Sequence, residues 1–246
     1  MKVFAVAMHK GGVGKTAITT NVAAVLADRG RRVLVVDADP QNHQARHFGI
    51  AAPERGLAES MFQQVPLPSI AFEVRDRLFL VGSGANLSSA DVHLSGKPDG
   101  HHRLRTALQT VKEQFDYVFI DCPPNLGLLT LNALVAASRP IVPVQTEQAA
   151  ADSLVSFHKT CMDVREFLNP SLEDLWILPS MFQGNTTHQR AILEHLRGNP
   201  WKCTVLDPIR RTVRIADAFA RGCPVYETDR TASDGFERVA ERIEAA

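Results

Sequence analysis

Short apolar runs alternate with longer amphipathic segments along most of the chain. The apolar runs, rich in Val, Ile, Leu and Phe, lie at 3–8, 32–37, 78–81, 117–121, 141–144 and 175–178. Between them, apolar residues recur at helical spacing, most clearly at 15–29, 101–115 and 154–168. Continuous apolar strands alternating with amphipathic helices are typical of a parallel sheet with helices on both faces. We therefore predict an α/β fold with a doubly wound, mostly parallel sheet, whereas the proline-containing stretch 40–77 predicts no clear element.

The composition is that of one large α/β domain. The chain has 246 residues, 45% of them hydrophobic, and no linker interrupts it, so we expect a single domain over 1–246. Because 27 basic residues balance 27 acidic ones, an anionic partner must be met by a local patch. The cysteines Cys122, Cys161, Cys203 and Cys223 are far apart, which is typical of a reducing compartment. Since no apolar run suits a membrane span or a signal segment, we expect a cytoplasmic protein.

A glycine-rich loop follows the first apolar run. It reads His9-Lys10-Gly11-Gly12-Val13-Gly14-Lys15-Thr16 and leads directly into a helical segment. In a phosphate-binding loop, backbone N–H groups surround the anion, the lysine reaches the terminal phosphates, and the hydroxyl that follows it binds Mg²⁺. A Walker A motif has Gly where this chain has His9, and a second lysine, Lys10, comes next. The alternative is a glycine-rich turn that binds nothing, but the order of strand, loop and helix favours a phosphate site.

Carboxylates stand at the ends of two other apolar runs. Asp121 closes its run in the Walker B arrangement of a carboxylate that accompanies Mg²⁺; the alternative is a cap of the next turn. Asp37 and Asp39, two residues apart, project to the same side of an extended chain. One of them would orient the attacking water while the other supports the loop or the metal, unless the two only form an Asp-Pro turn. Because ligands gather at the carboxyl ends of parallel strands, we expect the loop and these carboxylates to converge.

These motifs together resemble the deviant Walker A ATPases of the ParA, MinD and Soj group. The resemblance extends from residue 2 to about residue 228 and rests on 10–16, 36–41, 116–124, 125–134, 143–147, 211–218 and 222–225. It implies the P-loop NTPase fold of that class, with ATP and Mg²⁺ as cofactors. It also implies a homodimer that closes around ATP and slow hydrolysis that a ParB-like centromere-binding or adaptor protein stimulates. The function implied is plasmid or chromosome partition.

The resemblance also assigns roles to individual residues. Lys10 is the signature lysine, which reaches across the dimer and neutralises charge on the transferred phosphoryl group as an arginine finger does. Lys15 keeps its ordinary role, Asp39 positions the attacking water, and Asp121 is the Walker B aspartate; these four are the candidate catalytic residues. The nucleotide-binding residues implied are Lys10, Gly11, Gly12, Val13, Gly14, Lys15, Thr16 and Ala17, with Pro208 and Arg211 near the adenine. The candidate metal-binding residues are Thr16, Asp37 and Asp121.

The chain departs from the family pattern in several places. Ala17 replaces a second Thr, and Asn125 replaces a Ser. The segment 42–44, Asn-His-Gln, stands where the family has a small residue after Gln41, which leaves the conformation of this segment open. The segment 148–152 is less aromatic than its family counterpart, which leaves the contacts with a partner open.

Members of the family differ in the surface that they bind. Membrane-binding members end in an amphipathic helix with bulky apolar and basic residues. The helical segment at the end of this sequence has only a small apolar stripe, beside three Glu and two Arg; the stripe consists of Phe236, Val239, Ala240 and Ile243. We therefore expect this helix to pack on the domain and not to bind a membrane. Between 186 and 222, seven basic residues, Lys202 among them, stand against three acidic ones. We expect some of the basic residues to contact DNA phosphates without reading bases, and these are Arg190, Arg210, Arg211, Arg214 and Arg221. A solvated mixed-charge face is the alternative.

Other interpretations stay open. The same kind of ATPase would position a protein compartment or a chemotaxis cluster on the nucleoid, or would act on a membrane as MinD does. A more remote candidate is an iron–sulfur reductase component, which needs cysteines at a dimer interface; Cys122 and Cys161 have no obvious ligand geometry. We expect His101 and His102 to cap or solvate a helix, and we expect the protein to associate with the nucleoid.

Overall fold

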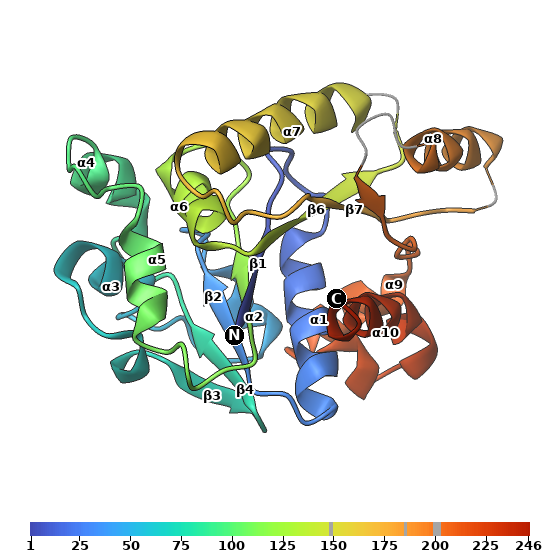
Figure 1. Cartoon of the computed structure of the whole chain (residues 1–246). Helices are drawn as coiled ribbons and strands as arrows, with labels where there is room; N and C mark the ends of the chain where they lie inside the picture. The colour runs from blue at the N-terminus through green and yellow to red at the C-terminus, as the bar shows by residue number, and fades with distance from the viewer. Residues whose placement is uncertain (148–149, 185, 199–202) are drawn as a thin grey trace.

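A computed structural model describes residues 1–147, 150–184, 186–198 and 203–246 (Figure 1). Within them, an eight-stranded sheet runs in the order β3-β4-β2-β5-β1-β6-β7-β8. Neighbouring strands are parallel except for β3 and β4, which form an antiparallel pair at one edge. The strands are β1 (Lys2–Val6), β2 (Val33–Asp37), β3 (Phe72–Arg75), β4 (Leu78–Val81), β5 (Tyr117–Asp121), β6 (Arg139–Gln145), β7 (Trp176–Ser180) and β8 (Thr204–Val205). The predicted doubly wound, mostly parallel sheet is confirmed.

Helices cover both faces of the sheet (Figure 1). The helices are α1 (Lys15–Asp28), α2 (His43–His47), α3 (Leu57–Gln63), α4 (Ala90–Leu94), α5 (Arg103–Gln109), α6 (Leu128–Ala136), α7 (Ala150–Phe167), α8 (Thr187–Arg197), α9 (Val213–Ala220) and α10 (Arg230–Glu244), with short 3-10 helices at Leu67–Ser69, Leu87–Ser89 and Val225–Glu227. One core lies between the sheet and α3 to α7, and the other lies between the sheet and α1, α2, α9 and α10. In β1, Val3 and Ala5 enter the first core and Phe4 and Val6 the second, which is why the strand is apolar throughout.

The structure differs from the sequence prediction in two places. The helix expected at 101–115 is α5, which ends at Gln109 and continues as turns. Thr110 explains this end, because its hydroxyl donates to the Ala107 carbonyl at 2.7 Å and accepts from the Leu67 N–H at 3.3 Å, in competition with the helical backbone bonds. The unassigned stretch 40–77 contains α2, α3, a 3-10 helix and β3.

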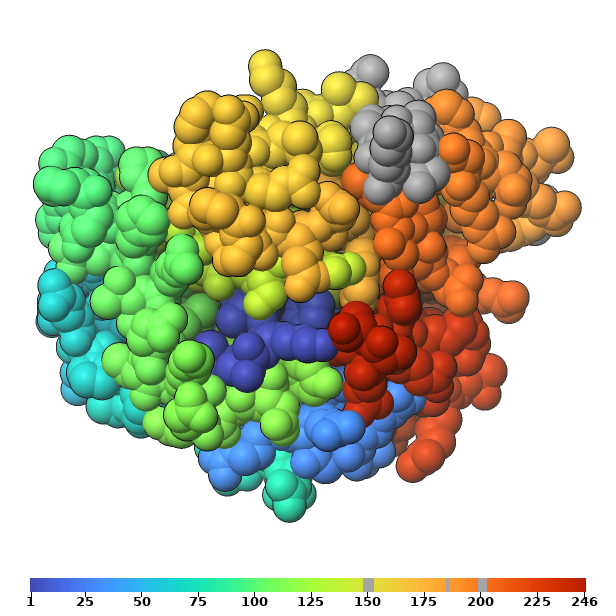
Figure 2. All heavy atoms as spheres, viewed as in Figure 1, coloured from blue at the N-terminus to red at the C-terminus, as the bar shows by residue number. Residues whose placement is uncertain are grey.

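The C-terminal helix α10 packs against α1, as expected. Its stripe of Phe236, Val239, Ala240 and Ile243 is buried in the second core. At its end, Glu244 accepts hydrogen bonds from Arg29 at 3.1 Å and Arg31 at 2.9 Å. Figure 2 shows this helix in red beside the dark-blue start of the chain. None of the helices that the structure describes is both long and apolar enough to cross a membrane.

Candidate functional site

The site is built at the carboxyl ends of the central strands. Asp37 at the end of β2 lies directly opposite Asp121 at the end of β5, and Val6 at the end of β1 lies on the other side of Asp121. The loop at 9–16 leaves β1 at this edge and leads into α1. The predicted convergence of the loop and the strand-end carboxylates is therefore confirmed.

The loop forms an anion cradle. Gly12 and Gly14 have φ values of 72° and 89°, a left-handed conformation that glycine adopts without steric cost. Gly14 is the N-cap of the 14-residue helix α1 and has no side chain to bond the first N–H groups, so these remain directed at an incoming anion. The Gln145 side chain donates to the Gly12 carbonyl at 3.1 Å and braces the loop against β6.

Lys15 lies at the centre of this cradle. The residue is 7% exposed, and its Nζ donates to the Lys10 carbonyl at 3.3 Å. Burial lowers its pKa, whereas the nearby Asp121, Cys122 and Asp39 act to raise it. A buried ammonium of this kind is stabilised by an anion placed against it, which is the role that the sequence predicts for Lys15 toward phosphate.

The second lysine points elsewhere. The Nζ of Lys10 donates to Oε2 of Glu147 at 2.9 Å, and the two side chains are 33% and 57% exposed. Lys10 is therefore held at the surface, next to the loop but paired outside it. Its backbone carbonyl accepts the hydrogen bond from Lys15 in the cradle, while its ammonium is directed at the Glu147 carboxylate on the surface.

Asp121 fits a magnesium-associated carboxylate. It is fully buried, its Oδ2 accepts from Gln44 Nε2 at 2.9 Å, and its Oδ1 has no hydrogen-bond partner among the described residues. Burial raises its pKa to about 7, against the opposing effects of hydrogen bonds from Gln44 and Thr16 and of the charge of Lys15. An orphaned buried carboxylate oxygen beside a threonine hydroxyl suits Mg²⁺, which prefers oxygen ligands and keeps several waters. Thr16 and Asp121 would hold such an ion.

Asp37 and Asp39 differ in how their oxygens are used. Asp37 is fully buried and accepts from the Asp39 N–H at 3.1 Å and from the Gln44 N–H at 3.0 Å, one bond to each oxygen. Burial, followed by the charge of Asp121, raises its pKa. Asp39 is 8% exposed and uses Oδ1 to accept from the Gln41 N–H at 3.0 Å. Of the two roles left open by the sequence, Asp37 therefore suits support of the loop, and Asp39 suits contact with water.

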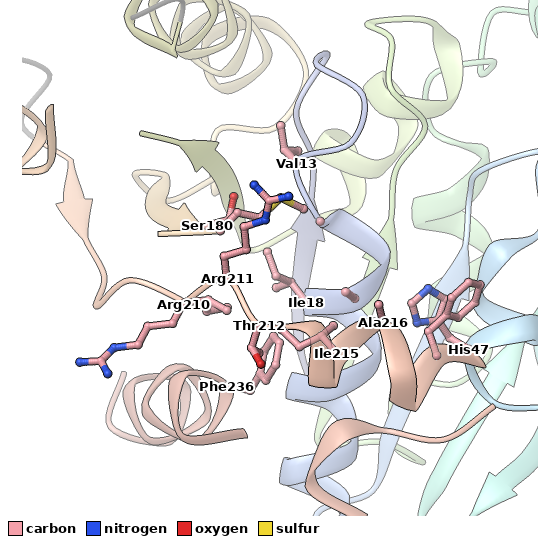
Figure 3. A pocket seen from close by; sticks show the side chains of 15 residues that line it. Val13, Ile18, His47, Ser180, Arg210, Arg211, Thr212, Ile215, Ala216 and Phe236 are labelled. Atoms are coloured by element: carbon pink, nitrogen blue, oxygen red, sulfur yellow. The ribbon is translucent and has the colours of Figure 1, made fainter. Parts of the chain in front are cut away.

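A cavity of about 330 Å³ opens beside the loop (Figure 3). It is lined by Val13, Gly14, Ala17, Ile18, His47, Ser180, Met181, Ile209, Arg210, Arg211, Thr212, Ile215, Ala216, Phe219 and Phe236. The cavity has the size and the apolar lining of a small-molecule site, and its place beside the phosphate cradle suits the base of a nucleotide. Of the two residues that the resemblance places near the adenine, Arg211 lines this cavity and Pro208 does not.

Ser180 and the two arginines have distinct orientations at this cavity. Figure 3 shows the Arg211 side chain extending toward Ser180 and Val13, while the Arg210 side chain points away. The Ser180 hydroxyl is buried and has no hydrogen-bond partner among the described residues. Ser180 is thus a polar group available to a ligand in the cavity.

The arginines predicted to contact DNA are all exposed. Arg190 lies on α8, Arg214 on α9, and Arg221 directly after α9. Arg214 pairs with Asp229 at 3.6 Å, and Arg190 donates to the Gly184 carbonyl. Within the described ranges, Arg210, Arg211 and Arg221 form no ion pair, so their charge is available to an external anion. Lys202 and residues 148–149 of the departing segment 148–152 lie outside what the structure describes.

The cysteines are held inside the fold. Cys122, Cys161 and Cys203 are buried, and Cys223 is partly buried. Burial, followed by the charge of Asp121, raises the pKa of Cys122 well above its usual value. Across the described part of the chain, no group of three or more His, Cys, Asp or Glu side chains is placed to hold a metal ion.

Sequence reasoning missed three residues of the site. Gln44 is fully buried and bonds to Asp121, although it was noted only as a departure from a pattern. Gln145 braces the loop, and Ser180 faces the cavity. A signal was present for the last two, because each is a polar residue at the end of an apolar strand, as Asp121 is.

Comparison with known proteins identifies the family of the chain. A family model described as an AAA domain matches residues 1–174. The chain is 38% identical to a chromosome-partitioning ATPase Soj of Thermus thermophilus over 98% of this chain and 94% of that protein. It is 34% identical to a chromosome partitioning protein ParA of Myxococcus xanthus over 93% of this chain and 82% of that protein.

Solved structures share the fold of this chain. A cobyrinic acid a,c-diamide synthase of Mycobacterium smegmatis, solved with an ATP analogue and magnesium, has a TM-score of 0.86 and is 31% identical over 99% of this chain and 94% of its own. A Cyanothece McdA(D38A)–ATP complex, 22% identical over 99% of this chain and 96% of its own, shares the fold with a TM-score of 0.89. The chain belongs to the ParA/Soj-type family of P-loop ATPases.

Proposed function

We propose that this chain is a partitioning ATPase that dimerises around Mg²⁺ and ATP and then binds DNA without sequence preference. The observation that carries the proposal is the division of labour between the two loop lysines. Lys15 fills the phosphate cradle, while Lys10 is paired outward with Glu147 at 2.9 Å. Lys10 is not needed to bind phosphate in the cradle of its own subunit, and it lies at the surface beside that cradle. Its ammonium is therefore placed to contact the nucleotide of a second subunit.

Each chemical task of ATP hydrolysis then has a residue in this chain. Thr16 and Asp121 hold the magnesium ion, which neutralises charge on the phosphates when bound. Lys15 contacts the terminal phosphates, and Asp39 orients the attacking water. Lys10 of each protomer supplies positive charge to the transferred phosphoryl group across the dimer, so hydrolysis and dimerisation depend on each other. We further propose that basal hydrolysis is weak and that a ParB-like protein stimulates it.

DNA is favoured over a membrane as the surface that the dimer binds. The apolar stripe of α10 is buried against the domain and is not available to lipid. The exposed Arg210, Arg211 and Arg221, which form no ion pair among the described residues, offer charge to phosphates, and dimerisation would double their number. The cargo is set by the partner protein; a plasmid or chromosome is our proposal, and a protein assembly carried over the nucleoid is the second candidate.

Co-sedimentation tests the proposal. The purified protein is incubated with plasmid DNA or with anionic liposomes, each with ATP, ADP or no nucleotide, at several salt concentrations. We expect DNA capture only with ATP, with a steep loss as salt rises. Capture that is equally tight without nucleotide would contradict the switch, and capture by liposomes would place the protein on membranes. Lys10→Ala is run beside the wild type and is expected to lose ATP-dependent capture.

A further inference from the structure

Gln44 occupies an unusual position for an uncharged residue. It is fully buried at the second residue of α2, between the end of β2, the start of α1 and the end of β5. Its side-chain nitrogen donates to Asp121 Oδ2 at 2.9 Å and to the Thr16 carbonyl at 3.3 Å. Its side-chain oxygen accepts from the Thr20 hydroxyl at 2.8 Å. One side chain therefore joins the phosphate loop to the strand that carries the candidate magnesium carboxylate.

The orientation of the Gln44 amide is fixed by its neighbours. Nε2 faces a carboxylate and a carbonyl, which only accept hydrogen bonds, so the NH₂ group must stand there. The oxygen then faces Thr20, whose hydroxyl can donate. A flipped amide would set two acceptors against each other beside Asp121. The amide is thereby held in one orientation relative to the carboxylate.

Gln44 also serves the other buried carboxylate. Its backbone N–H donates to Asp37 Oδ2 at 3.0 Å while its side chain donates to Asp121. These carboxylates lie opposite each other on adjacent strands, and both are fully buried. Two carboxylates buried so close together repel each other when both are ionised, and hydrogen-bond donors on their oxygens offset this repulsion. Gln44 supplies one donor to each.

We propose that Gln44 is a positioning residue for magnesium. It occupies Asp121 Oδ2 and so leaves Oδ1, which has no partner among the described residues, as the oxygen that meets the ion or its water. Because Gln44 lies seven residues after Asp37 in the segment that contains Asp39, it also fixes that segment to the metal-bearing strand. This inference rests on the proposed Mg²⁺ role of Asp121. It gives a function to the departure at 42–44.

The test measures magnesium binding rather than hydrolysis. A fluorescent ATP analogue is titrated with the full chain at a series of Mg²⁺ concentrations and in EDTA. Gln44→Met keeps the length of the side chain and removes its hydrogen bonds, and Gln44→Glu keeps the acceptor toward Thr20 but places an oxygen against Asp121. Thr20→Val removes the hydroxyl that lies 2.8 Å from the Gln44 amide oxygen and 2.9 Å from the Thr16 carbonyl. Gln63→Leu, on the exposed end of α3, is the control.

We expect the half-saturating Mg²⁺ concentration to rise about 10- to 100-fold for Gln44→Met and Gln44→Glu, as is typical when an outer-shell partner of a ligand is lost. Thr20→Val should give a smaller rise, and the control should give none. Affinity for the analogue in EDTA should change less than about twofold, because the loop and Lys15 are intact. An unchanged Mg²⁺ requirement in Gln44→Met, or an equal loss of affinity in EDTA, would overturn the positioning role. If the wild type itself binds the analogue independently of Mg²⁺, the metal role of Asp121 fails, and the role of Gln44 fails with it.

Discussion

The ion pair between Lys10 and Glu147 predicts that removing Glu147 strengthens the dimer. In the single chain, the ammonium of Lys10 lies 2.9 Å from the Glu147 carboxylate. If Lys10 reaches across the dimer to a nucleotide, this pair must first break. Glu147→Gln removes the competing charge while keeping the size of the side chain, so Lys10 is released before dimerisation.

The size of the effect follows from the exposure of the pair. The side chains are 33% and 57% exposed, and an exposed ion pair of this kind contributes about 0.2 to 1 kcal/mol. A symmetric dimer breaks two such pairs, which amounts to about 0.4 to 2 kcal/mol. The dimerisation constant of Glu147→Gln should therefore rise about 2- to 30-fold.

Sedimentation velocity with a non-hydrolysable ATP analogue measures this change over a range of protein concentrations. Lys10→Gln is the control and should prevent dimerisation, whether or not Glu147 is present. At high salt, the advantage of Glu147→Gln should shrink, because screening already weakens the pair. Dimerisation of Glu147→Gln that is equal to or weaker than that of the wild type would refute the argument, since Glu147 would then not compete for Lys10.

Three further predictions concern the cavity, the DNA surface and α2. Ser180→Ala should weaken ATP binding about 2- to 10-fold by calorimetry, because a buried hydroxyl that would bond the base is lost; unchanged affinity would argue against this contact. Arg210→Ala should lower DNA affinity and reduce the salt slope by about one per protomer without changing nucleotide affinity, whereas Arg211→Ala should weaken nucleotide binding first; equal effects of the two on nucleotide binding would contradict the orientations in Figure 3. Burial, with a smaller contribution from the charge of His43, lowers the pKa of His47 to about 4. The unfolded chain takes up this proton below about pH 6.5, so stability falls as the pH drops through this window. Between pH 7.5 and pH 5, the free energy of unfolding by urea should fall about 2 kcal/mol more in the wild type than in His47→Phe, and parallel profiles would disprove the assignment.

Much of the sheet was predictable because its strands are buried on both faces. Such strands must be apolar throughout, and polar residues at their ends then mark the edge where ligands bind. Asp37 and Asp121 were found in this way, and their direct opposition in the structure follows from β2 and β5 being neighbours. The extent of α5 was not predictable from periodicity, since Val111 and Phe115 remain buried after the helix has ended.

The role of Gln44 could not be read from the chain for a different reason. Its contacts join residues 28 and 77 positions away, so no local pattern describes them. A buried glutamine looks like an exposed one in sequence, because only the fold supplies the donors and acceptors around it. The short helix α2 also gave no periodic signal, as it contains only five residues.

The position of α2 gives the proposed switch a physical route. At its start, Gln44 bonds to the candidate magnesium carboxylate, and at its end the His47 ring lies 4.1 Å from the Phe219 ring of α9. Helix α9 also carries the exposed Arg214. Because α2 is a single short helix of five residues, we expect a displacement of Gln44 by changes around Asp121 to be passed on to His47. These contacts at the two ends of α2 join the nucleotide site to the helix that carries Arg214, and we propose this path for the ATP-dependent DNA binding of the proposed function.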